Sequence, residues 1–247
     1  MSKPLKILDL FSGIGGFSLG LERTGGFQTV AFCEIEKYCQ KVLNKHWPEV
    51  PCYDDICTLT ADRLASDGIS IDVICGGFPC QDISVAGGGA GIEGKRSGLW
   101  QEYARLIGEL RPRFVIVENV SALLARGLDR VLGDMAALGY DAEWHCIPAS
   151  YVGAPHRRDR IWIVAYPNGT SSQRSRLSGG IYAKHANTDG RSPHEKRAEA
   201  RNNWSVEPDV GRMAYGVPAA THRLKALGNS VVPQIPELIG RAILEMQ

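Results

Sequence analysis

A cysteine and an acid each follow a short apolar run in this sequence. Cys80 stands in "GGFPCQDIS", directly after Pro79 and shortly after the run Ile71–Cys75, and Glu118 follows the apolar residues of "VIVENV". A cysteine at the end of a buried strand is either a packing residue or a nucleophile, and its reactive form is the thiolate. The carboxyl ends of parallel strands meet at one edge of a sheet. We therefore expect Cys80 and Glu118 to border the same pocket, which favours the nucleophile.

A glycine-rich turn near the start of the chain indicates a ligand site. The stretch "LDLFSGIGGFSLGLE" has the order strand, turn, helix, and Gly13, Gly15 and Gly16 occupy the turn. The spacing is GxGG, and Ser18 stands where a dinucleotide fold has its third glycine. Glycines let the backbone approach a ligand closely, although a tight turn without a ligand has the same composition.

Two acidic residues indicate that the ligand of this site contains a nucleoside. Glu34 ends the next expected strand, where a nucleotide-binding fold places its ribose-binding acid. Asp55 follows the next short apolar segment and could hold an adenine amine. A third feature is "HRRDRIWIVA", in which arginines precede an expected strand. They could belong to a solvated turn, or they could be held rigidly and donate hydrogen bonds to a carbonyl or a phosphate.

Alternating strand-like and helix-like segments must position these residues. Strands are expected at Leu5–Leu10, Thr29–Cys33, Ile71–Cys75, Arg113–Val117 and Ile161–Tyr166. Helices are expected at Phe17–Arg23, Ile35–His46, Leu99–Leu110, Val131–Leu138 and Glu237–Glu245, the last opened by Pro236. This rhythm predicts an α/β fold, with a mostly parallel sheet and helices on both faces.

The pattern breaks after Pro167 and returns near Leu224. Residues 168–203 are rich in Ser, Gly, Asn, Lys and Arg, which suits a solvated loop or a surface that contacts phosphates. We predict a catalytic, cofactor-binding domain at 1–166, a small recognition lobe at 167–220, and a segment at 221–247 that returns to the catalytic domain.

Bulk properties limit the class of protein. The chain has 247 residues, 44% of them hydrophobic, and a formal net charge of +1, so any nucleic-acid surface must be local. The first residues, "MSKPLKILDLF", are too short an apolar run and too soon interrupted by charges to predict a signal peptide. No apolar run approaches the roughly 20 residues of a membrane span. The seven cysteines form no CxxC pair, which predicts reduced thiols and no structural zinc site.

The motifs together resemble those of the DNA cytosine-5 methyltransferases of the bacterial or phage type, over nearly the whole chain. The resemblance rests on "DLFSGIGG", "CEI", "DDI", "GGFPCQDIS", "RSGLW", "ENV", "RRDR" and "GNSVVP", in the family's order. His156 departs from it, because many members have glutamine there. The resemblance implies a Rossmann-like S-adenosylmethionine-dependent methyltransferase fold with a short target-recognition region.

Site residues follow from the resemblance by position. The catalytic set would be Cys80 as nucleophile, Glu118 as its acidic partner, and Arg158 and Arg160 as substrate-orienting groups. The cofactor set would be Phe11, Gly13, Gly16, Glu34, Ile35, Asp55, Ile56, Pro79, Leu99, Asn229 and Ser230. Gln81 and Ser84 would contact DNA from the closing loop, and composition adds Arg174, Arg176 and Arg201 from the basic segment. No metal ion is expected.

The implied activity is methyl transfer from S-adenosylmethionine to C5 of a cytosine flipped out of double-stranded DNA, through a bond from Cys80 to C6. S-adenosylhomocysteine would be the product. The enzyme would be a cytoplasmic monomer, acting alone, in a phage, or in a restriction–modification system with a cognate endonuclease. An RNA (tRNA) cytosine-5 methyltransferase is the nearest alternative. A non-catalytic DNA-binding module would not need Cys80, and a Rossmann dehydrogenase explains only the glycine turn.

Overall fold

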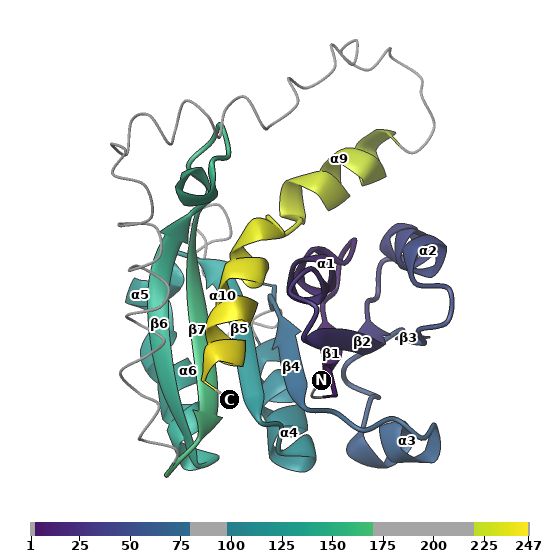
Figure 1. The fold of residues 1–247 in the computed structure, drawn as a ribbon, viewed down its shortest axis with the longest axis vertical. Coiled ribbons are helices and arrows are strands. Elements are labelled where there is room, and N and C mark those ends of the chain that lie inside the picture. The colour runs from purple at the N-terminus through teal and green to yellow at the C-terminus, as the bar shows by residue number, and fades with distance from the viewer. Residues whose placement is uncertain (1–2, 80–97, 170–219, 247) are drawn as a thin grey trace.

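The computed structural model describes residues 3–79, 98–169 and 220–246. These residues form a seven-stranded sheet flanked by helices (Figure 1). The strands are β1 (Leu5–Leu10), β2 (Phe27–Cys33), β3 (Cys52–Tyr53), β4 (Val73–Gly76), β5 (Phe114–Val120), β6 (Tyr140–Pro148) and β7 (Asp159–Pro167). The helices are α1 (Gly16–Glu22), α2 (Lys37–His46), α3 (Ala61–Ser66), α4 (Leu99–Leu110), α5 (Leu123–Arg126), α6 (Leu128–Ala137), α9 (Ala220–Asn229) and α10 (Gln234–Glu245), and a 3-10 turn, η3, spans Ala149–Val152.

The strand order reverses at β1, where sheets of this kind have a ligand-binding crevice. The order is β3-β2-β1-β4-β5-β7-β6, so the chain first builds outward from β1 in one direction and then returns to its other side. β1 to β5 are parallel, whereas β7 runs antiparallel to both β5 and β6. Ligands of such sheets bind outside the carboxyl ends of the strands, where the order reverses. In this sheet that point lies between β1 and β4.

Each face of the sheet has its own hydrophobic core because side chains alternate along a strand. Leu8 and Val115 belong to the core beneath α3, α4 and α6. Ile7 and Ile116, their chain neighbours, belong to the opposite core with α1 and α10. The predicted α/β fold, with a mostly parallel sheet and helices on both faces, is confirmed.

Local boundaries differ from the expected ones in several places. β6 was not expected, because its sequence "YDAEWHCIP" mixes charged and apolar residues, as suits an edge strand with one partner. The last helix begins at Gln234 rather than after Pro236, so this proline lies within the first turn, where it needs no backbone N–H. The division of the chain at 167 and 220 stays a prediction, since 170–219 lie outside the described residues.

The described helices are too short or too polar to cross a lipid bilayer. None of them combines the length and the apolar composition that a membrane span requires.

Candidate active site

The turn after β1 forms one wall of the crevice. Phe11, Gly13 and Gly15 all have positive φ angles, of 52°, 54° and 84°. A Cβ added at Gly13 would meet nothing within 4 Å, so the turn borders open space there. A Cβ at Gly16 would lie 2.7 Å from the carbonyl oxygen of Val231, so the room at Gly16 is filled by the chain itself. A ligand could therefore approach the backbone closely at Gly13. At Gly16, the missing side chain instead leaves room for the segment before α10.

Glu34 lies at the end of β2, with its carboxylate fixed beside this turn. The backbone N–H of Gly13 donates to Oε2 at 2.7 Å, and the backbone N–H of Glu36 donates to Oε1 at 2.8 Å. Only 8% of Glu34 is exposed. Each carboxylate oxygen has a further lone pair after these bonds, so the group can accept two more donors.

The next residue, Ile35, is apolar yet 69% exposed. An exposed aliphatic side chain beside a buried carboxylate matches a ligand that has a flat ring on one side and hydroxyls on the other. Ile56, in contrast, is 4% exposed and packs in the core, so a ligand would meet its backbone rather than its side chain. The Asp55 carboxylate accepts from the backbone N–H of Cys57 at 2.9 Å, which fixes the turn after β3.

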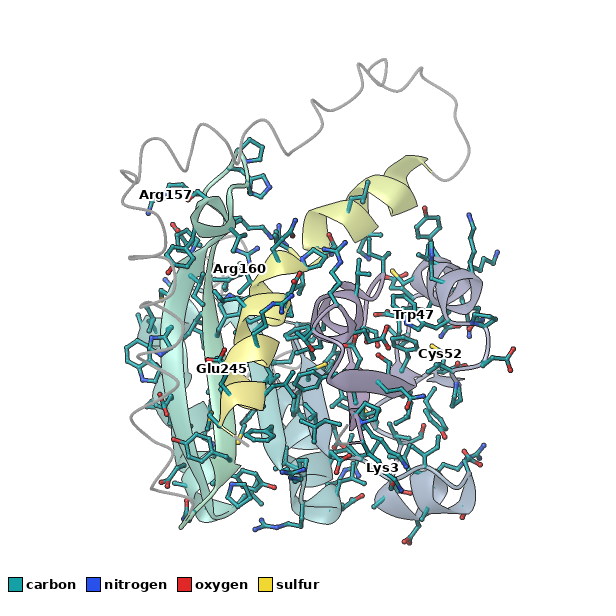
Figure 2. The ribbon with its side chains drawn as sticks, viewed as in Figure 1. Lys3, Trp47, Cys52, Arg157, Arg160 and Glu245 are labelled. Carbon is teal, nitrogen blue, oxygen red and sulfur yellow. The ribbon has the colours of Figure 1, made fainter. Side chains whose placement is uncertain are left out.

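A carboxyl–guanidinium pair lies at the far side of the crevice. Nε of Arg160 lies 2.8 Å from Oε1 of Glu118, and the Glu118 side chain is 13% exposed. Arg160 is the second residue of β7 and lies at the edge where β5 ends, because the two strands are antiparallel. Figure 2 shows Arg160 there, with Arg157 farther out on the preceding loop.

Burial controls the protonation of Glu118. It raises the pKa of the Glu118 carboxyl, while the positive charges of Arg160 and Arg158 act in the opposite direction. The net direction is upward, which favours the protonated acid as a hydrogen-bond donor.

Glu118 also touches the loop that leads to Cys80. A Cβ added at Gly77 would lie 2.7 Å from Oε2 of Glu118, so a side chain here would displace the carboxyl from its present position. The amide of Asn119 donates to the carbonyl oxygen of Phe78 at 3.2 Å and fixes the same loop. The structure thus pairs Glu118 with Arg160 and places the Glu118 carboxyl against Gly77, shortly before Pro79.

Arg158 has a different set of partners. Its Nη1 donates to the carbonyl oxygen of Gly228 at 2.6 Å, and its Nη2 donates to that of Ser230 at 3.0 Å. Asn229, between those two residues, is exposed, and the Ser230 hydroxyl donates to the Leu227 carbonyl at 2.9 Å.

The remaining predicted residues are distributed as follows. Phe11 stacks on Tyr103 with a centroid separation of 6.4 Å, and the half-buried Leu99 begins α4. Pro79 is half-buried at the end of a described range. The residues predicted from sequence that lie outside the described part of the chain are Cys80, Gln81, Ser84, Arg174, Arg176 and Arg201.

Sequence reasoning missed Asp9. This residue is fully buried in β1, and its Oδ2 accepts from the Ser18 hydroxyl at 2.7 Å and from the Ser18 backbone N–H at 3.3 Å. Burial raises the pKa of Asp9 to about 7, against the opposing effect of these bonds. An acid among the apolar residues at the end of the strand "LKILDL" was the available signal.

Comparison with known proteins decides the family. The model of the C-5 cytosine-specific DNA methylases matches residues 5–214. The chain belongs to this family. The match includes the turn after β1, the Glu118–Arg160 pair and the stretch that contains Cys80.

Relatives in this family include the Type II methyltransferase M2.BsuMI of Bacillus subtilis, 36% identical over 65% of this chain and 42% of that protein. The Type II methyltransferase M.HhaI of Haemophilus parahaemolyticus is 33% identical over 68% of this chain and 51% of its own length. The chain spans about half the length of these curated relatives.

Among solved structures, the Entamoeba histolytica methyltransferase EhMeth superimposes with a TM-score of 0.68 at 14% identity, over 99% of both chains. DNMT2 of Spodoptera frugiperda superimposes with a TM-score of 0.56 at 22% identity, over 67% of this chain and 50% of that one. At these sequence identities, both similarities are evidence for the fold and not for the activity.

Proposed function

We propose that this protein methylates C5 of cytosine in double-stranded DNA, with S-adenosylmethionine as methyl donor and Cys80 as nucleophile. The observation that carries the proposal is the Glu118 carboxyl, which pairs with Arg160 and lies against Gly77, three residues before Cys80 in the sequence. Membership of the C-5 cytosine-specific DNA methylases supports the same reaction.

The crevice beside β1 fits the proposed cofactor. Glu34 would accept the ribose hydroxyls, the exposed Ile35 would lie on the adenine, and the open side of Gly13 would admit the methionine portion. Asp55, Pro79, Leu99 and Asn229 would complete the site. When bound, the cofactor supplies an electrophilic methyl group.

The side chains explain why an unreactive carbon becomes nucleophilic. The Cys80 thiolate would add to C6 of the cytosine, which places electron density on C5. Protonated Glu118 would donate a hydrogen bond to N3, and Arg160 would donate to O2, so both would stabilise the charge that develops on the ring. After C5 has gained the methyl group, a base removes the C5 proton and the Cys80 sulfur leaves as thiolate, which restores the aromatic ring.

The target base must leave the DNA stack, at a cost of a few kcal/mol. We propose that residues 167–220 form the recognition lobe and that Arg174, Arg176 and Arg201 contribute phosphate or base contacts that offset this cost. Gln81 and Ser84 would contact DNA from the other side. The relatives' Type II names support a restriction–modification context, in which a cognate endonuclease is a proposed partner.

Bisulfite sequencing of DNA from cells that express the protein tests this function. We expect converted reads to retain cytosine at one short recurring sequence in cells with the wild type, and at none in cells with Cys80→Ser. Cys146→Ser, at an exposed cysteine on β6, is the matched control and should methylate as the wild type does. Methyl incorporation into tRNA but not into DNA in vitro would instead support the RNA enzyme.

A further inference from the structure

The segment between α9 and α10 closes against the start of α1. A Cβ added at Gly16 would lie 2.7 Å from the Val231 carbonyl oxygen, and one at Gly20 would lie 2.1 Å from that of Pro233. Figure 1 shows α9 at the same edge of the sheet as α1 and α2. We call residues 228–233 the strap, because they comprise the last two residues of α9 and the connection from α9 to α10 beside the glycine turn.

Arg158 binds this strap at two points. Its two terminal nitrogens donate to the carbonyl oxygens of Gly228, at 2.6 Å, and Ser230, at 3.0 Å. A guanidinium is suited to this task, because its donors are fixed in one plane and reach two acceptors at once. Two of the five N–H donors of the guanidinium are therefore used on the strap, which leaves fewer of them to meet a substrate.

The backbone of Arg158 is held in a conformation that few side-chain-bearing residues adopt. Its φ angle is 38°, in the left-handed region. Such conformations persist where the surrounding structure fixes them, and they cluster at functional sites. The two hydrogen bonds to the strap hold the Arg158 side chain, and so help to fix this backbone conformation.

Helix α9, which precedes the strap, has a weaker attachment. Nζ of Lys225 lies 2.7 Å from Oε1 of Glu36, but the two side chains are 56% and 46% exposed. Exposed ion pairs contribute little, because water and salt screen them. Arg158 is thus the stronger of these two attachments, and it lies on the base-binding side of the crevice, near Arg160 and Glu118.

We propose that Arg158 is a positioning residue, which fixes the strap and so joins the cofactor-binding side of the crevice to the Glu118–Arg160 pair. In this role it does not bind the cytosine. The proposal rests on the proposed function, and it replaces the substrate-orienting role that the resemblance implies for this residue.

The test compares Arg158→Ala and Arg158→Lys with Arg157→Ala. Arg157 is the adjacent arginine, its side chain is 81% exposed, and it pairs with Asp159 at 3.1 Å. Two readouts need no DNA and no turnover: affinity for S-adenosylmethionine by calorimetry, and hydrogen exchange of the strap amides by mass spectrometry. Steady-state kinetics adds the KM for cofactor and for DNA.

We expect Arg158→Ala to weaken cofactor binding by about 10-fold or more, from the loss of two charge-assisted hydrogen bonds. Strap exchange should accelerate, and the KM for cofactor should rise more than the KM for DNA. Arg158→Lys should recover part of the loss, because an ammonium reaches one carbonyl well but not both. Arg157→Ala should match the wild type.

Unchanged cofactor affinity and unchanged strap exchange in Arg158→Ala, with a fall in kcat or in DNA affinity, would overturn the proposal in favour of substrate binding. Thermal unfolding of each variant separates a local effect from failure to fold, and Arg158→Lys provides the second variant. If the wild type itself does not bind S-adenosylmethionine, the proposed function fails. The exchange measurement still decides whether Arg158 holds the strap.

Discussion

Nε of Arg160 lies 2.8 Å from Oε1 of Glu118, across two antiparallel strands. In the register of β5 and β7, Glu118 lies opposite Trp162 and Val120 lies opposite Arg160, so the charged pair is diagonal on one face. The carboxyl is nevertheless not a simple surface ion-pair partner, because burial raises its pKa against the effect of Arg160. The upward shift increases the fraction of the carboxyl that is protonated and can donate a hydrogen bond to a ring nitrogen.

Glu118→Ala should lower kcat by about 100-fold or more, as expected when a positioned acid is lost from an active site. Glu118→Gln should lose less, because its amide still donates a hydrogen bond. Transfer of tritiated methyl groups to DNA measures both variants, with the exposed Glu49→Ala as control. A rate for Glu118→Ala near that of the wild type would exclude this role.

Cys80→Ser should abolish methyl transfer, with a loss in kcat/KM equivalent to more than about 3 kcal/mol, because an alcohol does not ionise as a thiol does. Binding of S-adenosylmethionine should persist. DNA with 5-fluorocytosine at the target should trap an adduct at Cys80, since fluorine cannot leave as a cation. An adduct at Cys75 instead would contradict the assignment, and burial, which raises the pKa of the Cys75 thiol well above its usual value, argues against one.

Glu34→Ala should weaken S-adenosylmethionine binding by about 1.5–3 kcal/mol, the usual contribution of hydrogen bonds to a charged group. The loss has two sources, because the carboxylate also holds the backbone N–H groups of Gly13 and Glu36. Calorimetry measures it, with Asp54→Ala as control, since Asp54 forms an exposed pair with Lys37. Equal affinity in Glu34→Ala and in the wild type would place the ribose elsewhere.

Asp9 predicts a pH dependence of stability. Its pKa rises from 3.8 to about 7 on folding, so the folded state favours the protonated acid. The contribution of Asp9 to the free energy of unfolding is therefore fully present below about pH 4 and is lost as the pH rises to about 7. The loss is up to roughly 4 kcal/mol, at 1.36 kcal/mol per pH unit. Asp9→Asn cannot ionise, so its free energy of unfolding relative to the wild type should increase between pH 4 and pH 8. Urea denaturation measures this difference, and parallel pH curves for the two proteins would contradict the prediction.

The sequence by itself determined the local elements and the residues that end them. Helix α4 has the expected bounds, Leu99–Leu110, because its apolar residues recur at helical spacing over three turns. The glycine turn and Glu34 were predictable for a similar reason, since each follows an apolar strand whose carboxyl end must face the crevice. β6 was not predictable in this way, because an edge strand with polar residues lacks the apolar run of a buried one.

Only the tertiary structure decided which of these residues meet. Arg160 reaches Glu118 because β7 turns antiparallel to β5, and local periodicity does not encode the direction of a strand. Arg158 reaches Gly228 and Ser230 because residues some 70 positions apart converge when α10 packs on α1. The raised pKa of Asp9 likewise comes from the layers that bury β1 on both faces. Contacts of this kind depend on how the whole chain folds, which is why residue types and spacing identified the candidates but not their partners.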